Sequence, residues 1–222
     1  MKILGILGSP RTHGNTVLLL DAALAAAAEA GAQTEKLGIA GLELNFCTAC
    51  GKCYATGQCI YDDGVTMLQS KMMEADGIIL ASPNYIHSVT AQLKTLMDRS
   101  SLHIHCILFD GKYGASVATT GGAGAETVAK FANDYLQSCG AQTVGIAVAQ
   151  AAGVGALVDQ EAAVAWAAAL GTDLVAAIRE RRTYADQMAA HELFAERMKQ
   201  LVVRMSDKAP FQVEHWRKMG WL

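Results

Sequence analysis

Short apolar runs alternate with helix-like stretches along most of this 222-residue chain. The apolar runs predict strands at Lys2–Gly8, Thr34–Ile39, Gly77–Ala81, Tyr113–Thr119 and Thr143–Ala149. The stretches between and after them predict helices at Asn15–Ala30, Val65–Glu74, Thr90–Leu102, Glu126–Ser138 and Asp159–Glu180. This alternation is typical of an α/β fold built from parallel βαβ units with right-handed crossovers. We therefore expect a doubly wound, five-stranded parallel sheet of order 2-1-3-4-5, which binds ligands outside the carboxyl ends of its strands.

Two segments do not fit the alternation. The loop at 40–63, after the second strand, carries four of the six cysteines and is too long for an ordinary connection, which favours a functional role. The segment 183–222 has a mixed-charge helical pattern followed by Pro210, Phe211, Trp216 and Trp221. We expect one domain at 1–182 and a helical extension at 183–222 that serves packing or oligomerisation.

Composition narrows the class of protein. Hydrophobic residues make up 52% of the chain, enough for a large core, and the net charge of −3 offers no basic surface for nucleic acid. No apolar run suggests a membrane-spanning helix, and the N-terminal run is a core strand rather than a signal peptide. Without a secretory signal, the cysteines favour metal or redox chemistry in a reducing, cytoplasmic setting.

A polar turn directly follows the first strand and precedes a helix. Backbone N–H groups and the positive end of the helix dipole favour an anion at such a point. The Gly-Lys-Ser/Thr of a P-loop and the Gly-x-Gly-x-x-Gly of a dinucleotide fold are both absent. The turn is either an ordinary helix start or a site for one terminal phosphate, and its candidate binding residues are Ser9, Arg11, Thr12, Gly14, Asn15 and Thr16.

Two more loops follow strands at the same predicted edge. One offers an aromatic ring and an amide, and the other offers a flexible backbone that can follow a flat polar edge. Together they could hold the rim of an isoalloxazine ring, although Tyr85 could also simply pack at a strand end. The candidate residues are Pro83, Asn84, Tyr85, Ile86, Ser88, Thr119, Thr120, Gly121 and Gly122.

These stretches carry a family resemblance. Gly8-Ser9-Pro10-Arg11…Gly14-Asn15-Thr16, the run from Ala75 to Tyr85, and Leu93-Lys94…Asp98-Arg99 resemble the NADPH-dependent FMN reductase family of flavodoxin-like proteins over roughly residues 1–150. The resemblance implies noncovalently bound FMN that passes electrons through N5 of its flavin. It also makes NAD(P)H a possible electron donor.

The four clustered cysteines, Cys47, Cys50, Cys53 and Cys59, have the spacing C-x2-C-x2-C-x5-C. Four thiolates suit a [4Fe–4S] cluster or a structural zinc ion. The other interpretations are that the cysteines carry out thiol–disulfide chemistry or that they bind no metal. The remaining two, Cys106 and Cys139, are expected to be buried thiols.

The cysteine segment resembles the compact motif of the iron–sulfur flavoproteins, a subgroup of the same family. The resemblance implies a [4Fe–4S] cluster on Cys47, Cys50, Cys53 and Cys59. It also implies a homodimer or homotetramer in which the cluster of one subunit lies near the flavin of a neighbour.

Several other polar residues are given no catalytic role. His103 and His105 are expected at a surface or interface, and Lys94 and Arg99 as structural or solvated residues. The pair Asp62-Asp63 is expected to cap the next helix. No side chain is singled out as catalytic, because electron transfer through a flavin needs little acid–base work.

The sequence therefore predicts an FMN-dependent oxidoreductase that passes electrons between a [4Fe–4S] cluster and FMN, with a redox protein or a nicotinamide nucleotide as partner. The first alternative is an NAD(P)H-dependent FMN or quinone reductase without a cluster. The second is a non-enzymatic, zinc-stapled flavin-binding protein.

Overall fold

A computed structural model describes residues 1–222 and contains a single six-stranded sheet of order β2-β1-β3-β4-β5-β6. The strands are β1 (Lys2–Leu7), β2 (Gln33–Gly38), β3 (Gly77–Pro83), β4 (Tyr113–Thr120), β5 (Gln142–Gly153) and β6 (Ala156–Leu157). The first five are parallel and have the predicted order. The expected strand count was wrong by one, because β5 runs past Ala149 and turns back into the short antiparallel strand β6.

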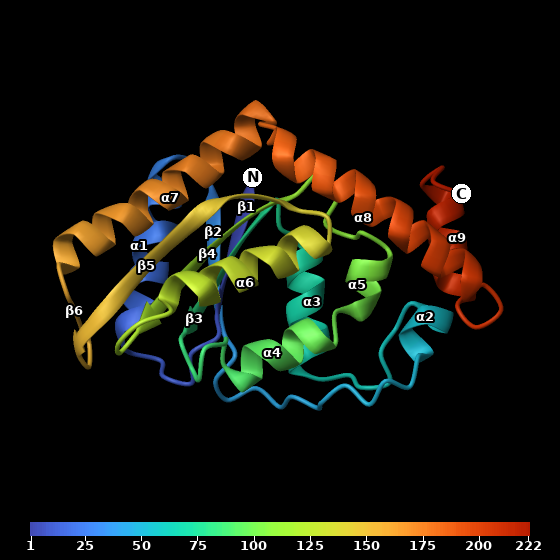
Figure 1. The fold of residues 1–222 in the computed structure, drawn as a ribbon. Helices are drawn as coiled ribbons and strands as arrows, with labels where there is room; N and C mark the ends of the chain where they lie inside the picture. Colours follow the sequence, from blue (N-terminus) through green and yellow to red (C-terminus); the bar gives the residue numbers. More distant parts are fainter.

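Nine helices surround this sheet, and their packing follows the alternation of side chains along each strand. They are α1 (Asn15–Glu29), α2 (Lys52–Thr56), α3 (Gly64–Glu74), α4 (Ala91–Asp98), α5 (Ser101–His105), α6 (Ala125–Ser138), α7 (Gln160–Glu180), α8 (Ala185–Arg204) and α9 (Pro210–Lys218). Ile3 and Leu7 pack in one core with α1 and α7, whereas Leu4 and Ile6 pack in a second core with α3, α4 and α6. The sheet is therefore covered on both faces (Figure 1).

The predicted helix Thr90–Leu102 is divided into α4 and α5. Thr90 begins α4 by accepting a hydrogen bond from the Leu93 N–H at 3.3 Å. Near the break, the Ser100 hydroxyl donates to the Leu96 carbonyl at 2.7 Å, the kind of local bond that competes with a continuous helix. The division turns His103 inward, so the expectation of a surface position for it was wrong: His103 is 7% exposed.

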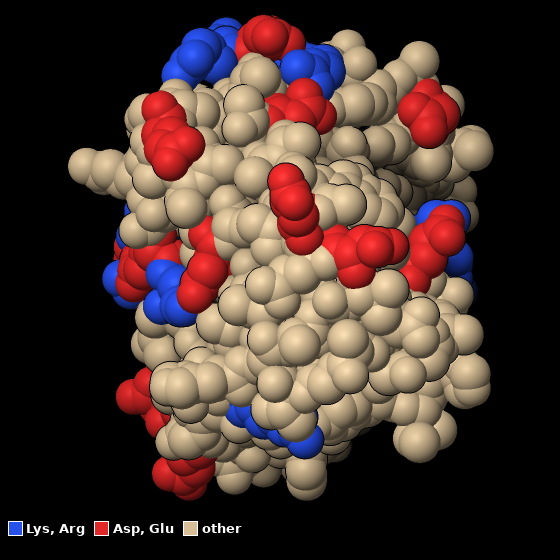
Figure 2. Space-filling view, turned by 90° about the vertical axis from the view of Figure 1, so that its left-hand side faces the viewer, with Lys and Arg blue, Asp and Glu red and all other residues tan.

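Helix α7 has the length and the mean hydropathy, 1.4, of a membrane-spanning helix, although no apolar run in the sequence was expected to form one. It lies along α1 and buries Leu170, Leu174 and Val175 in the core that these two helices share. It is thus a core helix of this fold. Its outer side and the neighbouring hairpin expose Val154, Val158 and Trp166, and Figure 2 shows few charged side chains across the centre of this face.

The C-terminal extension consists of α8 and α9. Helix α8 leaves the sheet at an angle to α7 and buries only Met198 and Val202 (Figure 1). Helix α9 returns to the body beside α2 and α5, where the buried Trp216 indole donates to the His105 carbonyl at 2.9 Å. The extension therefore reaches from the end of α7 to the cysteine segment.

Candidate flavin mouth and cysteine cavity

The loops after β1, β3 and β4 leave the sheet at one edge, because Leu7 lies opposite Ala81 and Pro83 opposite Thr119. They enclose a cavity of about 200 Å³, which we call the flavin mouth. Its lining residues are Ser9, Arg11, Gly14, Asn15, Thr16, Pro83, Asn84, Tyr85, Thr119, Thr120, Gly121 and Ala151. The structure thus brings most of the predicted cofactor residues together, whereas Thr12, Ile86, Ser88 and Gly122 do not line this cavity.

The turn before α1 presents free backbone donors to the mouth. Within it the Arg11 N–H bonds the Ser9 hydroxyl at 3.1 Å, but the N–H groups of Thr12 to Thr16 have no acceptor in the protein. Gly14, with φ of 152°, begins the helix without a capping side chain. An uncapped helix start with unpaired N–H groups is a suitable site for a phosphate.

Two side chains in the first turn of α1 fasten it to distant strands. The Asn15 amide donates to the Gly153 carbonyl at 2.8 Å, and its oxygen is buried without a partner. The Thr16 and Thr119 hydroxyls bond each other at 2.6 Å. The phosphate turn is therefore held at fixed positions relative to β4 and the end of β5.

The loop after β3 forms a tight turn in which the backbones of Tyr85 and Ser88 bond each other at 2.9 and 3.1 Å. Ile86 and His87 at its tip have φ of 49° and 62°, a conformation that costs a branched residue about 1–2 kcal/mol. Ile86 is 94% exposed and Tyr85 is 45% exposed, so both present apolar surface beside the mouth.

Asn84 connects this loop to the one after β4. Its backbone N–H donates to Thr119 at 2.6 Å and its amide donates to the Ala123 carbonyl at 2.7 Å. Its side-chain oxygen is buried and unpartnered, like that of Asn15. Such orphaned acceptors beside a cavity are suited to a donor on a bound ligand.

Sequence reasoning missed the contribution of β5. Ala151 lines the mouth and Gly153 accepts the Asn15 amide, because β5 continues beyond the apolar run that predicted it. The Gly153-Val154-Gly155 sequence is a turn signal that could have indicated the hairpin with β6.

A second cavity, of about 260 Å³, is lined by all four predicted cysteines, and we call it the cysteine cavity. Cys47 and Cys50 are exposed, Cys53 and Cys59 are half-buried, and all are free thiols. Burial, together with the neighbouring Cys59, raises the pKa of the Cys53 thiol. No three Cys, His, Asp or Glu side chains converge closely enough to hold a single metal ion.

Arg99 and Asp63 form a buried ion pair beside the cysteine cavity, with side chains 1% and 4% exposed. Asp63 accepts hydrogen bonds from the Val65 and Asn45 N–H groups at 3.0 and 2.9 Å, so it caps α3 as predicted. Burial opposes ionisation, but the bonds from Arg99 and Asn45 prevail and lower the pKa of the Asp63 carboxyl to about 2. The Arg99 guanidinium is structural, one of the two roles expected for it, and also donates to Cys59, which sequence reasoning did not predict.

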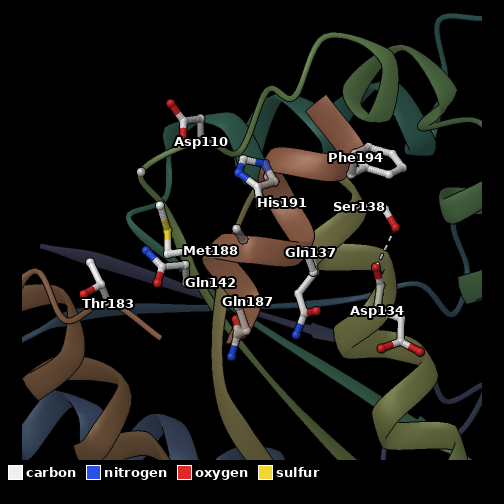
Figure 3. A pocket seen from close by; sticks show the side chains of 14 residues that line it. Asp110, Asp134, Gln137, Ser138, Gln142, Thr183, Gln187, Met188, His191 and Phe194 are labelled. Atoms are coloured by element: carbon white, nitrogen blue, oxygen red, sulfur yellow. Dashed lines mark hydrogen bonds between the residues drawn. The ribbon is translucent and has the colours of Figure 1, made fainter. Parts of the chain in front are cut away.

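A larger cavity of about 340 Å³ lies at the opposite end of the sheet, between α6 and α8 (Figure 3). His191 and Gln187 of α8 line it together with Asp134 of α6 and Asp110. None of the predicted site residues takes part. The Gln187 side chain hydrogen-bonds both the N–H and the carbonyl of Thr143. We therefore interpret this cavity as a packing gap between α8 and the sheet.

Comparisons with known proteins agree with this geometry. Residues 1–154 match the family described as NADPH-dependent FMN reductase. An iron–sulfur flavoprotein from Archaeoglobus fulgidus is 36% identical over 228 residues, covering 100% of each chain. A flavone reductase structure covers 83% of this chain and 66% of its own, with a TM-score of 0.67 and 22% identity. An archaeal flavodoxin covers 81% and 99%, with a TM-score of 0.54 and 15% identity.

The structural likenesses confirm the flavodoxin-like fold, and the family match extends over more than half of the chain. Together with a mouth of free amides at the carboxyl ends of the strands, they confirm the predicted class, a flavin-dependent oxidoreductase that takes FMN. The chain belongs to the NADPH-dependent FMN reductase family.

Proposed function

We propose that this chain is an electron-transfer flavoprotein that passes electrons between FMN and a [4Fe–4S] cluster held by Cys47, Cys50, Cys53 and Cys59. The observation that carries the proposal is that all four thiols line one cavity in a chain that also has a flavin mouth. FMN would supply one- or two-electron chemistry, and the cluster one-electron chemistry.

The mouth residues fit FMN. The free N–H groups of Thr12 to Thr16 and the Arg11 side chain would hold the terminal phosphate. Asn84 and the glycine-rich loop after Thr120 would hold the polar rim of the ring, and Tyr85 with Ile86 would cover it. Thr12, Ser88 and Gly122 complete the proposed set from the same three loops.

The cysteine cavity offers four thiols as ligands. Four thiolates are the ligand set of a [4Fe–4S] cluster and also of a structural zinc ion. The name of the full-length relative, an iron–sulfur flavoprotein, supports the cluster.

Helix α4 connects the two sites. At its start the Thr90 hydroxyl bonds the Gly8 carbonyl, directly before the phosphate turn, and just after its end Arg99 lines the cysteine cavity. Its eight residues span about 12 Å. This short helix joins the phosphate turn to the cysteine cavity within one chain.

For the organisation of the chain, we propose an FMN domain at 1–182 and an oligomerising extension at 183–222, in a homodimer or homotetramer. Helix α8 supports this because Leu193 and Val203 are 77% and 53% exposed on it. The proposed partner is a redox protein or a nicotinamide nucleotide. A cytoplasmic setting would keep the free thiols reduced for ligation.

Purification of the full chain without air, followed by iron, sulfide and flavin analysis, tests the proposal. We expect about four iron and about four sulfide per FMN, with broad visible absorbance beneath the flavin bands. Flavin without iron, together with rapid reduction by NADPH or NADH in stopped flow, would instead support the reductase without a cluster. Stoichiometric zinc without turnover would support the zinc-stapled binding protein.

A further inference from the structure

One side chain from outside the cysteine loop contacts it at several points. Arg99 follows α4, and its Nη1 donates to Asp63 Oδ2 at 2.5 Å and to the Asn45 carbonyl at 3.1 Å. Its Nη2 donates to Cys59 Sγ and to the Tyr61 carbonyl, each at 3.3 Å. The guanidinium therefore joins the two ends of the cysteine segment and reaches one of its sulfurs.

The charge beside Cys59 is fixed and largely removed from water. Arg99 is the one basic residue that lines the cysteine cavity, and its side chain is 1% exposed. Lys94, on the same helix, is 44% exposed and is paired with Asp98. Nη1 of Arg99 is paired with Asp63, which fixes the position of the guanidinium. Nη2, which faces Cys59, is therefore a hydrogen-bond donor in a fixed position and not a mobile surface charge.

We propose that Arg99 is a positioning residue that raises the reduction potential of the cysteine site through its hydrogen bond to the Cys59 sulfur. The inference rests on the proposed function, since it requires iron–sulfur ligation by the four cysteines. Each electron that enters adds one negative charge beside the guanidinium, and no bond forms or breaks. A buried cationic donor stabilises the more negative state more than the less negative one.

A purely structural role would be satisfied by the bonds of Nη1 to Asp63 and Asn45 and of Nη2 to the Tyr61 carbonyl, with no need for a donor on the sulfur. The planar fork of arginine makes both sets of bonds at once, and a lysine ammonium in the same place would not reach both. A structural role and a role in setting the reduction potential can therefore be distinguished by measuring the reduction potential, but not by measuring folding or iron content.

The test is an EPR-monitored redox titration of the anaerobically purified full chain, with dithionite as reductant. Removing Arg99 alone would leave a buried, unpaired Asp63, so the informative variant is the double substitution Arg99→Met with Asp63→Asn. We expect its reduction equilibrium to be about tenfold less favourable than that of the wild type, which is a midpoint about 59 mV lower for one electron.

Matched variants fix the sign of the effect. Asp63→Asn alone leaves the guanidinium unneutralised, so its midpoint should lie above that of the wild type. Lys130→Met removes an exposed positive charge from α6, where neither Lys130 nor its partner Glu126 lines the cysteine cavity, and should leave the midpoint unchanged. Arg99→Lys keeps the charge without the fork and should fall between the wild type and the double variant.

An iron-replete double variant with the wild-type midpoint overturns the inference and leaves the proposed function standing. Wild-type protein without iron contradicts both. If every Arg99 variant loses iron, pulsed EPR on reduced wild-type protein carrying arginine labelled with the heavy nitrogen isotope decides. A hyperfine coupling to arginine nitrogen supports the inference, because Arg99 is the one arginine at the cavity, and its absence overturns it.

Discussion

At the scale of single residues, Asn15 shows how the mouth is prepared for an anion. Its amide is oriented by the Gly153 carbonyl, and its own N–H is one of the free donors at the start of α1. An aspartate there would gain about 0.3–1 kcal/mol from the helix dipole but would lose the bond to the Gly153 carbonyl, which is worth about 0.5–1.5 kcal/mol. The same charge would repel a phosphate at that point, so FMN binding should respond more strongly than folding.

Asn15→Asp should weaken FMN binding by roughly 10–100-fold, about 1.4–3 kcal/mol, because a charge-assisted phosphate site gains a repulsive neighbour. Quenching of flavin fluorescence on titration of the apoprotein measures the change. Riboflavin, which lacks the phosphate, is the matched control and should bind both proteins equally. An equal loss for both ligands would show that the substitution had reshaped the mouth instead.

At the scale of elements, the contact between α1 and α7 fixes the position of α1, which begins directly after the phosphate turn. Gly171 of α7 faces the α1 backbone so closely that a Cβ built on it would lie 2.0 Å from the Ala23 carbonyl oxygen. Alanine improves helix propensity over glycine by about 1 kcal/mol, whereas overpacking a core contact costs about 1–3 kcal/mol. Because the obstacle is backbone rather than a flexible side chain, overpacking should prevail.

Gly171→Ala should therefore lower the free energy of unfolding by roughly 1–2 kcal/mol, measured by urea denaturation of the apoprotein. Ala169→Gly, at an exposed position of the same helix, calibrates the propensity term and should cost about 1 kcal/mol. If Gly171→Ala stabilises the protein by a similar amount, the two helices are not in the contact described.

At the scale of the whole molecule, stability should depend on pH through buried groups. His103 lies against Phe109 with ring centroids 5.6 Å apart, and its Nδ1 has no partner. Burial lowers the pKa of His103 from 6.5 to about 4. Between these values the unfolded chain binds a proton that the folded protein does not, so stability falls as the pH falls through this window.

Between pH 7 and pH 4 this group should remove about 2–3 kcal/mol from the free energy of unfolding. Urea denaturation across that range should show a shallower loss for His103→Phe than for the wild type. His13→Gln, at an exposed position, should follow the wild-type slope. Parallel curves for the wild type and His103→Phe would contradict the assignment.

The sequence by itself determined the features that depend on residues close together in the chain. The alternation of apolar runs and helical stretches predicted the five parallel strands, because strand and helix periodicities are properties of neighbouring residues. Their order followed from the general rule for doubly wound sheets. The turn from Ser9 to Thr16 and the spacing of the four cysteines were equally readable, since each group lies within a short stretch. These features were sufficient to indicate the family, the flavin and the candidate sulfur ligands.

The tertiary structure decided what depends on residues far apart in the chain. The Asn15 contact to Gly153 spans 138 positions and the Arg99 contact to Cys59 spans 40, and no local pattern encodes either. The division between α4 and α5 turned His103 inward and placed Arg99 against the cysteine loop. Burial, and with it the pKa and the partner of a charged side chain, is set by which elements pack around it, so it follows from the assembled fold alone.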